Sequence, residues 1–278
     1  MSSDAGGVYA ALGAALQRGG AGLGLTFAVR VGQTAPATLP ALVLTLGVQA
    51  LREAQQRAAQ SPAWADVPIL AALLPQSAHR PLAAQLPRGS SAVWLDQPVE
   101  RCLDLLRLAL PQRRRVGVLL GPASRSQEAA VDRATQARGL QAVKAQVDTP
   151  AAELYPALQT VLQTADVFLA LPDPSLFSAE ALQNILIASY RQRVPLLSYS
   201  AGHVRAGATL ALHTPVEAVA EQVLQALRQW QAGRALPAPA LAQGFAVAVN
   251  EQVARSLSLD LRSASELEAA LRRQEGRP

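Results

Sequence analysis

The sequence predicts an α/β protein of two lobes, each an open parallel sheet flanked by helices. Short apolar runs alternate with longer amphipathic runs along the whole chain. The alternation falls into two series, one before about residue 96 and one after it, and each has too few strands for a closed barrel. Half of the 278 residues are hydrophobic, which is enough to pack a core in both lobes.

The first series contains the elements expected of βαβ units. An amphipathic stretch at 8–17, followed by the helix-ending residues Gly19 and Gly20, predicts a helix. Polar residues at 76–80 predict a loop. The remaining elements are a helix at 47–59 and strands at 25–31, 41–46, 69–74 and 91–95.

The second series repeats this pattern. Ser126 and Ser178 are predicted to cap the helices that they begin, because a serine oxygen accepts from the free amides of a first turn. Strands are predicted at 116–120, 140–147, 167–171, 195–198 and 245–249. Helices are predicted at 98–110, 126–138, 152–164, 178–191, 215–232 and 263–274.

The basic charge of the chain does not indicate a nucleic-acid-binding protein. The formal net charge is +5, and Lys144 is the only lysine among 25 basic residues. Apart from the run 113–115 the arginines are scattered and no aromatic residue lies near that run, whereas nucleic-acid surfaces concentrate both. The run is predicted to be a solvated turn, with an anion contact as the alternative. No apolar stretch reaches the roughly 18 residues of a membrane span, so we expect neither nucleic acid nor membrane insertion.

Catalytic and cofactor motifs are incomplete. The glycine-rich stretch 19–24 lacks the GxGxxG spacing and precedes a strand, the reverse of a dinucleotide loop. The histidines lack metal-ligand spacing, and the single Cys102 permits neither a thiolate cluster nor an internal disulfide. We therefore expect no enzyme, cofactor or metal. A serine hydrolase using Ser200 stays as an alternative, although Ser198 replaces the elbow glycine and no acid lies between Ser200 and His213.

Candidate binding residues follow the predicted strands, because open α/β sheets bind ligands beyond the carboxyl ends of their strands. Asp173, held between two prolines, is suited to an amino group or hydroxyl, or alternatively caps the next helix through an Asx turn. Ser124 precedes a predicted helix, whose free amides and dipole suit a carboxylate. His203 is predicted to be a surface or capping residue, with a ligand contact as the alternative.

Four segments stand in an order and spacing similar to those of a known family: 108–119, 165–173, 194–198 with 204–208, and 245–257 followed by 264–271. The chain resembles the ABC-transporter substrate-binding proteins of the tryptophan/aromatic-amino-acid type, which have the type I periplasmic-binding-protein fold. The resemblance implies lobes of 1–96 with 214–243 and 97–213 with 244–278, joined by three crossovers. It also implies a small ligand in an interlobe cleft, bound by hinge closure without catalytic machinery.

The resemblance carries over to only part of the binding site. Asp173 matches the family's cleft aspartate, and Ser124 and Ser200 match cleft positions by strand order. Val48 and Pro174 stand where the family has polar residues, so the ligand stays open. Tyr9 is suited to stacking on the ligand or donating its hydroxyl, with a core role as the alternative. The expected binding set is Asp173, Ser124, Ser200, Tyr9, Gly47, Gln76 and His203.

The start of the chain departs from the family. Family members begin with a strand, whereas residues 2–4 are similar to the loop that follows it, so the first lobe is predicted to lack its central first strand. Residues 1–7 carry no export signal, and a cytoplasmic location therefore stays open beside a periplasmic or cell-envelope one.

The resulting functional hypothesis is a monomeric solute-binding component of an ABC uptake system. It binds a small amino-acid-like ligand and works with a membrane permease. The alternative from the same fold is a ligand-sensing or scaffolding module with a degenerate pocket, which Val48 and Pro174 favour.

Overall fold

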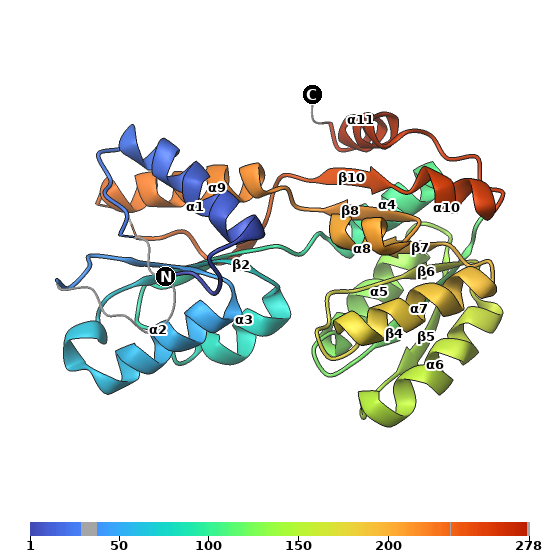
Figure 1. The fold of residues 1–278 in the computed structure, drawn as a ribbon, viewed down its shortest axis with the longest axis horizontal. Helices are drawn as coiled ribbons and strands as arrows, with labels where there is room; N and C mark the ends of the chain where they lie inside the picture. The colour runs from blue at the N-terminus through green and yellow to red at the C-terminus, as the bar shows by residue number, and fades with distance from the viewer. Residues whose placement is uncertain (29–37, 234, 277–278) are drawn as a thin grey trace. The chain divides into compact units, whose positions relative to one another are not determined.

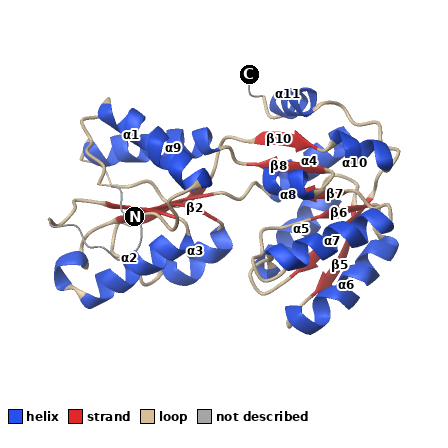
Figure 2. Ribbon diagram, in the orientation of Figure 1, coloured by secondary structure: helices blue, strands red, loops and turns tan. Residues whose placement is uncertain are grey.

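The computed structural model of the chain describes residues 1–28, 38–233 and 235–276 (Figure 1). These residues form two compact units, Met1–Asp96 with Thr214–Phe245 and Gln97–His213 with Ala246–Pro278. The chain therefore passes from one unit to the other after Asp96, after His213 and after Phe245. Each unit has an open sheet with helices on its faces (Figure 2), which confirms the predicted α/β class.

Unit 1 is built on a four-stranded parallel sheet in the order β1-β2-β3-β9. Every residue of β2 is buried, as expected of a strand covered on both faces. One apolar core contains residues of α1 and α9, and a second contains residues of α2 on the other face of the sheet. The elements are α1 (Gly7–Ala21), β1 (Val43–Leu46), α2 (Val48–Gln60), a 3₁₀ turn (Pro62–Trp64), β2 (Ile69–Leu74), α3 (Gln76–Ala83), β3 (Ser91–Trp94), α9 (Val216–Gln231) and β9 (Ala240–Leu241).

Helix α1 extends through the two glycines that were predicted to end it. A Cβ atom at Gly19 would lie 2.2 Å from Leu224 Cδ1 of α9, and one at Gly20 would lie 2.2 Å from Phe27 Cε2. The glycines therefore admit neighbouring side chains to the surface of the helix, and Gly22 is its C-cap. The prediction of a helix end at Gly19 was wrong because these glycines serve packing.

The start of the chain pairs with β1 on the side opposite β2. The Met1 amino group donates to Leu44 O at 2.6 Å, Leu46 N donates to Met1 O at 2.9 Å, and Ser3 N donates to Leu46 O at 2.9 Å. Ser2 and Leu46 form an isolated parallel bridge. Among the described residues no strand precedes α1. Residues 1–3 nevertheless lie beside the carboxyl end of β1, where a neighbouring strand would pair.

Unit 2 has a six-stranded sheet in the order β10-β8-β7-β6-β4-β5. All its pairs are parallel except β10 with β8, where Ala246 faces His213. The chain leaves this unit at the end of β8 and returns at the start of β10, so the returning strand runs backwards beside β8. The strands are β4 (Arg115–Leu120), β5 (Gln141–Gln146), β6 (Val167–Leu169), β7 (Leu196–Ser198), β8 (Leu210–His213) and β10 (Ala246–Val249).

The helices of unit 2 largely follow the predicted ranges. Ser178 accepts from Ala181 N and caps α7 as predicted. The prediction for Ser126 was wrong, because that serine lies inside a 3₁₀ turn, Arg125–Gln127, which leads into α5. The helices are α4 (Val99–Ala109), α5 (Glu128–Gln136), α6 (Pro150–Thr164), α7 (Ala179–Arg191), α8 (Ala201–Ala206), α10 (Glu251–Ser256) and α11 (Ala264–Gln274).

Three further differences separate the predicted elements from the structure. Residues 76–80 begin helix α3 instead of a loop, with Pro81 inside the helix and His79 buried against the sheet. Strands β8 and β9 and helix α10 were not predicted. Of the predicted strand 25–31, residues 25–28 are not a strand and 29–31 lie outside the described residues.

The arginine run at 113–115 leads into β4. Asp166 accepts from the amides of Arg114 and Arg115 at 3.0 and 2.9 Å, and the Arg115 guanidinium contacts the same carboxylate at 2.7 Å. Burial raises the pKa of Asp166, but hydrogen bonds from Arg115 and the two amides outweigh it and hold the pKa at about 2. Arg115 thus connects the start of β4 to the loop before β6 through Asp166.

No helix in the described part of the chain is long and apolar enough to cross a membrane.

Candidate functional site

The loops that follow β4, β6 and β7 belong to neighbouring strands of the unit 2 sheet. Because the carboxyl ends of parallel strands share one edge, these loops gather there. They carry four of the predicted binding residues: Ser124, Asp173, Ser200 and His203.

Asp173 joins the loops after β4 and β6. Its Oδ2 atom accepts from Ala123 N at 3.1 Å, Ser124 N at 2.9 Å and Ser124 Oγ at 2.8 Å. Its Oδ1 atom accepts from Ser175 N at 3.0 Å and Ser175 Oγ at 2.6 Å. Asp173 and Ser124 are both 0% exposed, so the protein itself supplies the partners that water would otherwise supply.

The surrounding backbone fits this carboxylate closely. Gly121 N donates to Ser124 Oγ at 2.9 Å, which orients the serine hydroxyl toward Asp173. A Cβ atom at Gly121 would lie 2.6 Å from Asp173 Oδ2, so a larger residue would displace the carboxylate. The bond from Ser175 N is the Asx turn that one interpretation of the sequence predicted. A direct contact between Asp173 and a ligand amino group stays a prediction.

Ser200 and His203 lie at the start of α8, after β7. Ser200 Oγ accepts from Gly202 N at 3.1 Å and caps the helix. His203 Nδ1 lies 2.6 Å from Ser198 Oγ, and its ring packs edge-on against Tyr199 at a centroid distance of 4.9 Å. Burial lowers the pKa of His203, which favours the neutral ring.

Among the described hydrogen bonds, none joins the side chain of Ser200 to that of His203, the nearer of the two histidines that follow it in the sequence. The described hydrogen bond of the His203 ring leads to Ser198, which is 2% exposed, whereas that of Ser200 leads to backbone. Nucleophilic catalysis requires the base within hydrogen-bond reach of the attacking hydroxyl. The sequence did not single out Ser198 as a partner of His203, although a spacing of five residues across a strand–helix turn was available as a signal.

In unit 1 the structure brings Tyr9 and Gly47 together. Gly47 has φ +89°, and a Cβ atom there would lie 2.8 Å from Tyr9 Cε1 and 2.6 Å from Ser3 Oγ. Ser3 Oγ accepts from Ala50 N at 2.9 Å and thus satisfies a first-turn amide of α2, whose own N-cap is a glycine. Ser3 was missed, because a hydroxyl that caps a helix 47 residues away leaves no local pattern.

Gln76 lies at the first turn of α3. Its backbone amide donates to Asp96 Oδ2 at 2.6 Å. Burial raises the pKa of Asp96, and the hydrogen bond from the Gln76 amide opposes that rise. Asp96 was also missed, although it directly follows the predicted strand 91–95 and the rule that selected Asp173 would have selected it.

One buried histidine of unit 1 has no hydrogen-bond partner among the described residues. His79 is 2% exposed, and neither ring nitrogen is bonded. Its ring lies 5.7 Å from that of Trp94, whose indole nitrogen is also unbonded. Burial lowers the pKa of His79. No cluster of three or more histidine, cysteine, aspartate or glutamate side chains suited to a metal occurs in the part of the chain that the structure describes.

Comparison with known proteins relates the chain by fold. No family model matches it, and no curated protein matches it. A ligand-free, open substrate-binding protein with adhesive properties from Clostridium difficile is similar at 17% identity, with 94% of each chain covered and a TM-score of 0.70. An ABC domain in complex with L-Trp from Streptococcus pneumonia is similar at 14% identity over 96% of each chain, with a TM-score of 0.68.

Regulatory proteins share the same fold. A LacI family transcriptional regulator from Mycobacterium smegmatis is similar at 12% identity, with 95% of this chain and 98% of that chain covered and a TM-score of 0.53. The chain therefore has the type I periplasmic-binding-protein fold. Identities this low establish the fold alone.

Proposed function

We propose that the chain is the solute-binding component of an ABC uptake system and binds a small amino-acid-like ligand. The observation that carries the proposal is the fold, which matches a substrate-binding protein with a TM-score of 0.70 over 94% of both chains. The two open sheets add the loops at which such folds bind ligands. In this role the chain works as a monomer with a membrane permease, in the periplasm or cell envelope.

The described hydrogen bonds suggest different roles for the candidate residues. Asp173 and Ser124 bond to each other and hold their loops, so we assign them to shaping the binding edge. Ser200 and His203 are half-buried and keep surface toward solvent, and we assign them to ligand contact. In unit 1 we assign the same role to Tyr9, beside Gly47.

A thermal-shift screen of amino acids and small metabolites, followed by calorimetry, tests the proposal. A ligand at 100 times its Kd stabilises a one-site protein by about 2.7 kcal/mol, which raises the melting temperature by about 5 °C or more. Intact, folded protein that binds none of these compounds would sink the proposal.

Two variants test the assigned contacts once a ligand is found. Ser200→Ala and Tyr9→Phe each remove one hydroxyl, and each should weaken binding about 5- to 30-fold if that hydroxyl bonds the ligand. Ser256→Ala is the matched control, because that serine is exposed and its hydroxyl donates to Val253 O. Equal affinity in all three variants would refute the assignment.

A sensing module of the same fold is the second candidate. The apolar residues Val48 and Pro174 at the binding edges favour it, and the likeness to a LacI family regulator supports it. Permease and ATPase genes beside this gene would support uptake, whereas a kinase or receptor gene would support sensing.

A further inference from the structure

The loops at the carboxyl edge of the unit 2 sheet contain a single carboxylate side chain. They are residues 121–127 after β4, 170–178 after β6 and 199–206 after β7, and Asp173 is their only acidic residue. Asp173 is 0% exposed, and the amides and hydroxyls of neighbouring residues bond to both of its oxygens. These loops therefore present no accessible carboxylate to the amino group of a ligand.

The same loops carry two arginines, which differ in their partners. Arg125 forms an ion pair with Asp148, which follows β5. Arg205 of α8 is exposed and forms no hydrogen bond or ion pair with any described residue. The residues outside the described ranges include no aspartate or glutamate that could pair with it. The positive charge of Arg205 is therefore available to a ligand.

The guanidinium of Arg205 lies over the first turn of α8. A Cβ atom at Gly202 would lie 3.7 Å from Arg205 Nη2 and 3.3 Å from Ser200 Oγ. The guanidinium and the serine hydroxyl thus lie within 4 Å of one point beside Gly202. Helical side chains lean toward the helix N-terminus, and here this direction brings the charge back toward the end of β7.

His203, on the same turn, offers an uncharged N–H group. Ser198 Oγ is buried, and His203 Nδ1 at 2.6 Å is its described partner. If Nδ1 carried the ring proton, the buried serine proton would lack an acceptor among the described residues, which is costly. The serine therefore donates to Nδ1, and the ring proton is on Nε2. Burial lowers the pKa of His203 and favours this neutral ring, whose half-buried position leaves Nε2 without a described partner.

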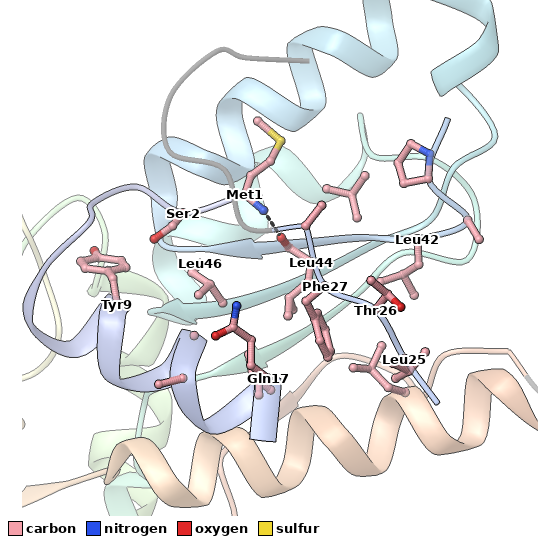
Figure 3. Close-up of a pocket in the computed structure, with 18 of the residues that line it drawn as sticks. Met1, Ser2, Tyr9, Gln17, Leu25, Thr26, Phe27, Leu42, Leu44 and Leu46 are labelled. Atoms are coloured by element: carbon pink, nitrogen blue, oxygen red, sulfur yellow. Dashed lines mark hydrogen bonds between the residues drawn. The ribbon is translucent and has the colours of Figure 1, made fainter. Parts of the chain in front are cut away.

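The cavity of unit 1 suits a different chemical group. It has a volume of about 710 Å³ and is lined mostly by apolar side chains (Figure 3). Asp4 is the only side chain with a formal charge among its described lining residues, and this charge repels anions. The Met1 amino group donates to Leu44 O at 2.6 Å, and burial lowers its pKa. The described lining therefore suits an apolar part of a ligand better than a carboxylate.

On the basis of the solute-binding function proposed above, we propose that unit 2 recognises a carboxylate of the solute through the Arg205 guanidinium and the Nε2–H group of His203. The planar fork of an arginine matches the two oxygens of a carboxylate. An amino-acid-like ligand carries this group, but the loops after β4, β6 and β7 hold no accessible partner for its amino group. The solute class is therefore organic carboxylates, with or without an amino group.

The test is calorimetry of the full chain with matched sets of small molecules. Hydrocinnamate, isocaproate and propionate are each compared with their uncharged amides and with L-phenylalanine, L-leucine and L-alanine, respectively. We expect at least one acid to bind within about threefold of its amino acid and at least tenfold more tightly than its amide, because hydrogen bonds to charged groups are the stronger ones. An amide that binds as tightly as its acid, or an amino acid that binds when its deaminated acid does not, would overturn the inference.

Variants of two exposed arginines locate the carboxylate. Arg205→Gln should weaken binding of the acid at least tenfold and leave that of the amide unchanged. The melting temperature should also stay unchanged, because Arg205 has no described partner to lose. Arg255→Gln is the matched control: it removes the same charge from an exposed arginine of α10, which follows β10 at the opposite edge of the sheet, where Val249 pairs with Leu210. Equal losses in the two variants would overturn the inference.

Variants of His203 test the uncharged donor. His203→Leu should weaken binding of the acid about three- to tenfold, whereas His203→Gln keeps an N–H donor and should weaken it less. The reverse order would overturn the role given to Nε2–H. Folded protein that binds no acid of the panel would overturn the whole inference, whereas the proposed solute-binding function falls only if the wider metabolite screen also finds no ligand.

Discussion

Replacement of Asp173 by alanine removes the carboxylate that connects the loops after β4 and β6. Its donors are the amides of Ala123, Ser124 and Ser175 and the hydroxyls of the two serines, at 2.6 to 3.1 Å. The hydroxyls can rotate toward other acceptors, but the amides cannot. Removing one partner of a buried charged network costs roughly 3–5 kcal/mol. We therefore expect the free energy of unfolding of unit 2 to fall by about 4 kcal/mol.

Asp173→Asn should cost less, about 2 kcal/mol. Its carbonyl oxygen can take the place of Oδ2 and keep the amides of Ala123 and Ser124 as donors. Its NH₂ group then faces the amide of Ser175, so one donor is left opposed by another. The expected order of stability is wild type, then asparagine, then alanine.

Urea unfolding followed with two probes measures the loss of stability in unit 2 separately from unit 1. The three tryptophans, Trp64, Trp94 and Trp230, all belong to unit 1, whereas far-ultraviolet circular dichroism follows both units. If the units unfold in separate transitions, Asp173→Ala moves the dichroism transition of unit 2 and leaves the fluorescence transition in place. The exposed Asp260→Ala is the control and should stay within about 0.5 kcal/mol of wild type.

A fall in the free energy of unfolding of less than about 1 kcal/mol in Asp173→Ala would refute the idea that this carboxylate holds the two loops together. The carboxylate would then be available for a ligand, as the resemblance to the substrate-binding family implies. A ligand affinity that falls in Asp173→Asn while the folded fraction stays unchanged would support the same conclusion. The two roles are thus separable by measuring stability and binding on the same variants.

Three other predictions follow from the described contacts. Gly19→Ala should destabilise unit 1 by about 1 kcal/mol, because its Cβ would lie 2.2 Å from Leu224 Cδ1, whereas Gly13→Ala, with no atom within 4 Å, should stabilise it by a similar amount in thermal melts. Burial lowers the pKa of His79, so its contribution to stability is complete above about pH 6.5 and is lost as the pH falls below that value. His79→Phe should therefore remove part of the acid sensitivity of the tryptophan-detected transition, and unchanged sensitivity would contradict this. Burial lowers the pKa of His203 too, so His203→Phe should do the same for the dichroism transition of unit 2.

Hydrophobic periodicity predicted most of the fold because most of the strands are apolar runs buried between helical layers, the edge strand β5 being an exception. The predicted strand 69–74 coincides with β2, all of which is buried. The errors occur where tertiary contacts override local signals. Gly19 ends no helix, because its partner is a leucine of α9 more than 200 residues later, and Pro81 does not prevent α3, whose first turn is bonded to Asp96.

Candidate residues could be selected from the sequence because ligands of open α/β sheets bind beyond the carboxyl ends of the strands, and this rule needs only the positions of the strands. Their contact with a ligand stays a prediction. The rule selected Ser124 and Asp173 separately. Their bond could not be predicted, because the two residues lie 49 positions apart and meet only when β4 and β6 are neighbours in the sheet. The sequence also left Asp173 open between cap and ligand contact, and the choice depends on how many donors the fold directs at each carboxylate oxygen.

Both units have a buried aspartate at the carboxyl edge of the sheet that accepts a hydrogen bond from the loop after a neighbouring strand. In unit 2, Asp173 follows β6 and binds the amide of Ser124 in the loop after the neighbouring β4. In unit 1, Asp96 follows β3 and binds the amide of Gln76 after the neighbouring β2. A buried carboxylate that accepts from the backbone of the next loop fixes that loop without using any outward-facing side chain. In the solute-binding role that we propose, selectivity then depends on the side chains carried by the loops, among them Ser200, and these can vary while the buried carboxylates keep the loops in place.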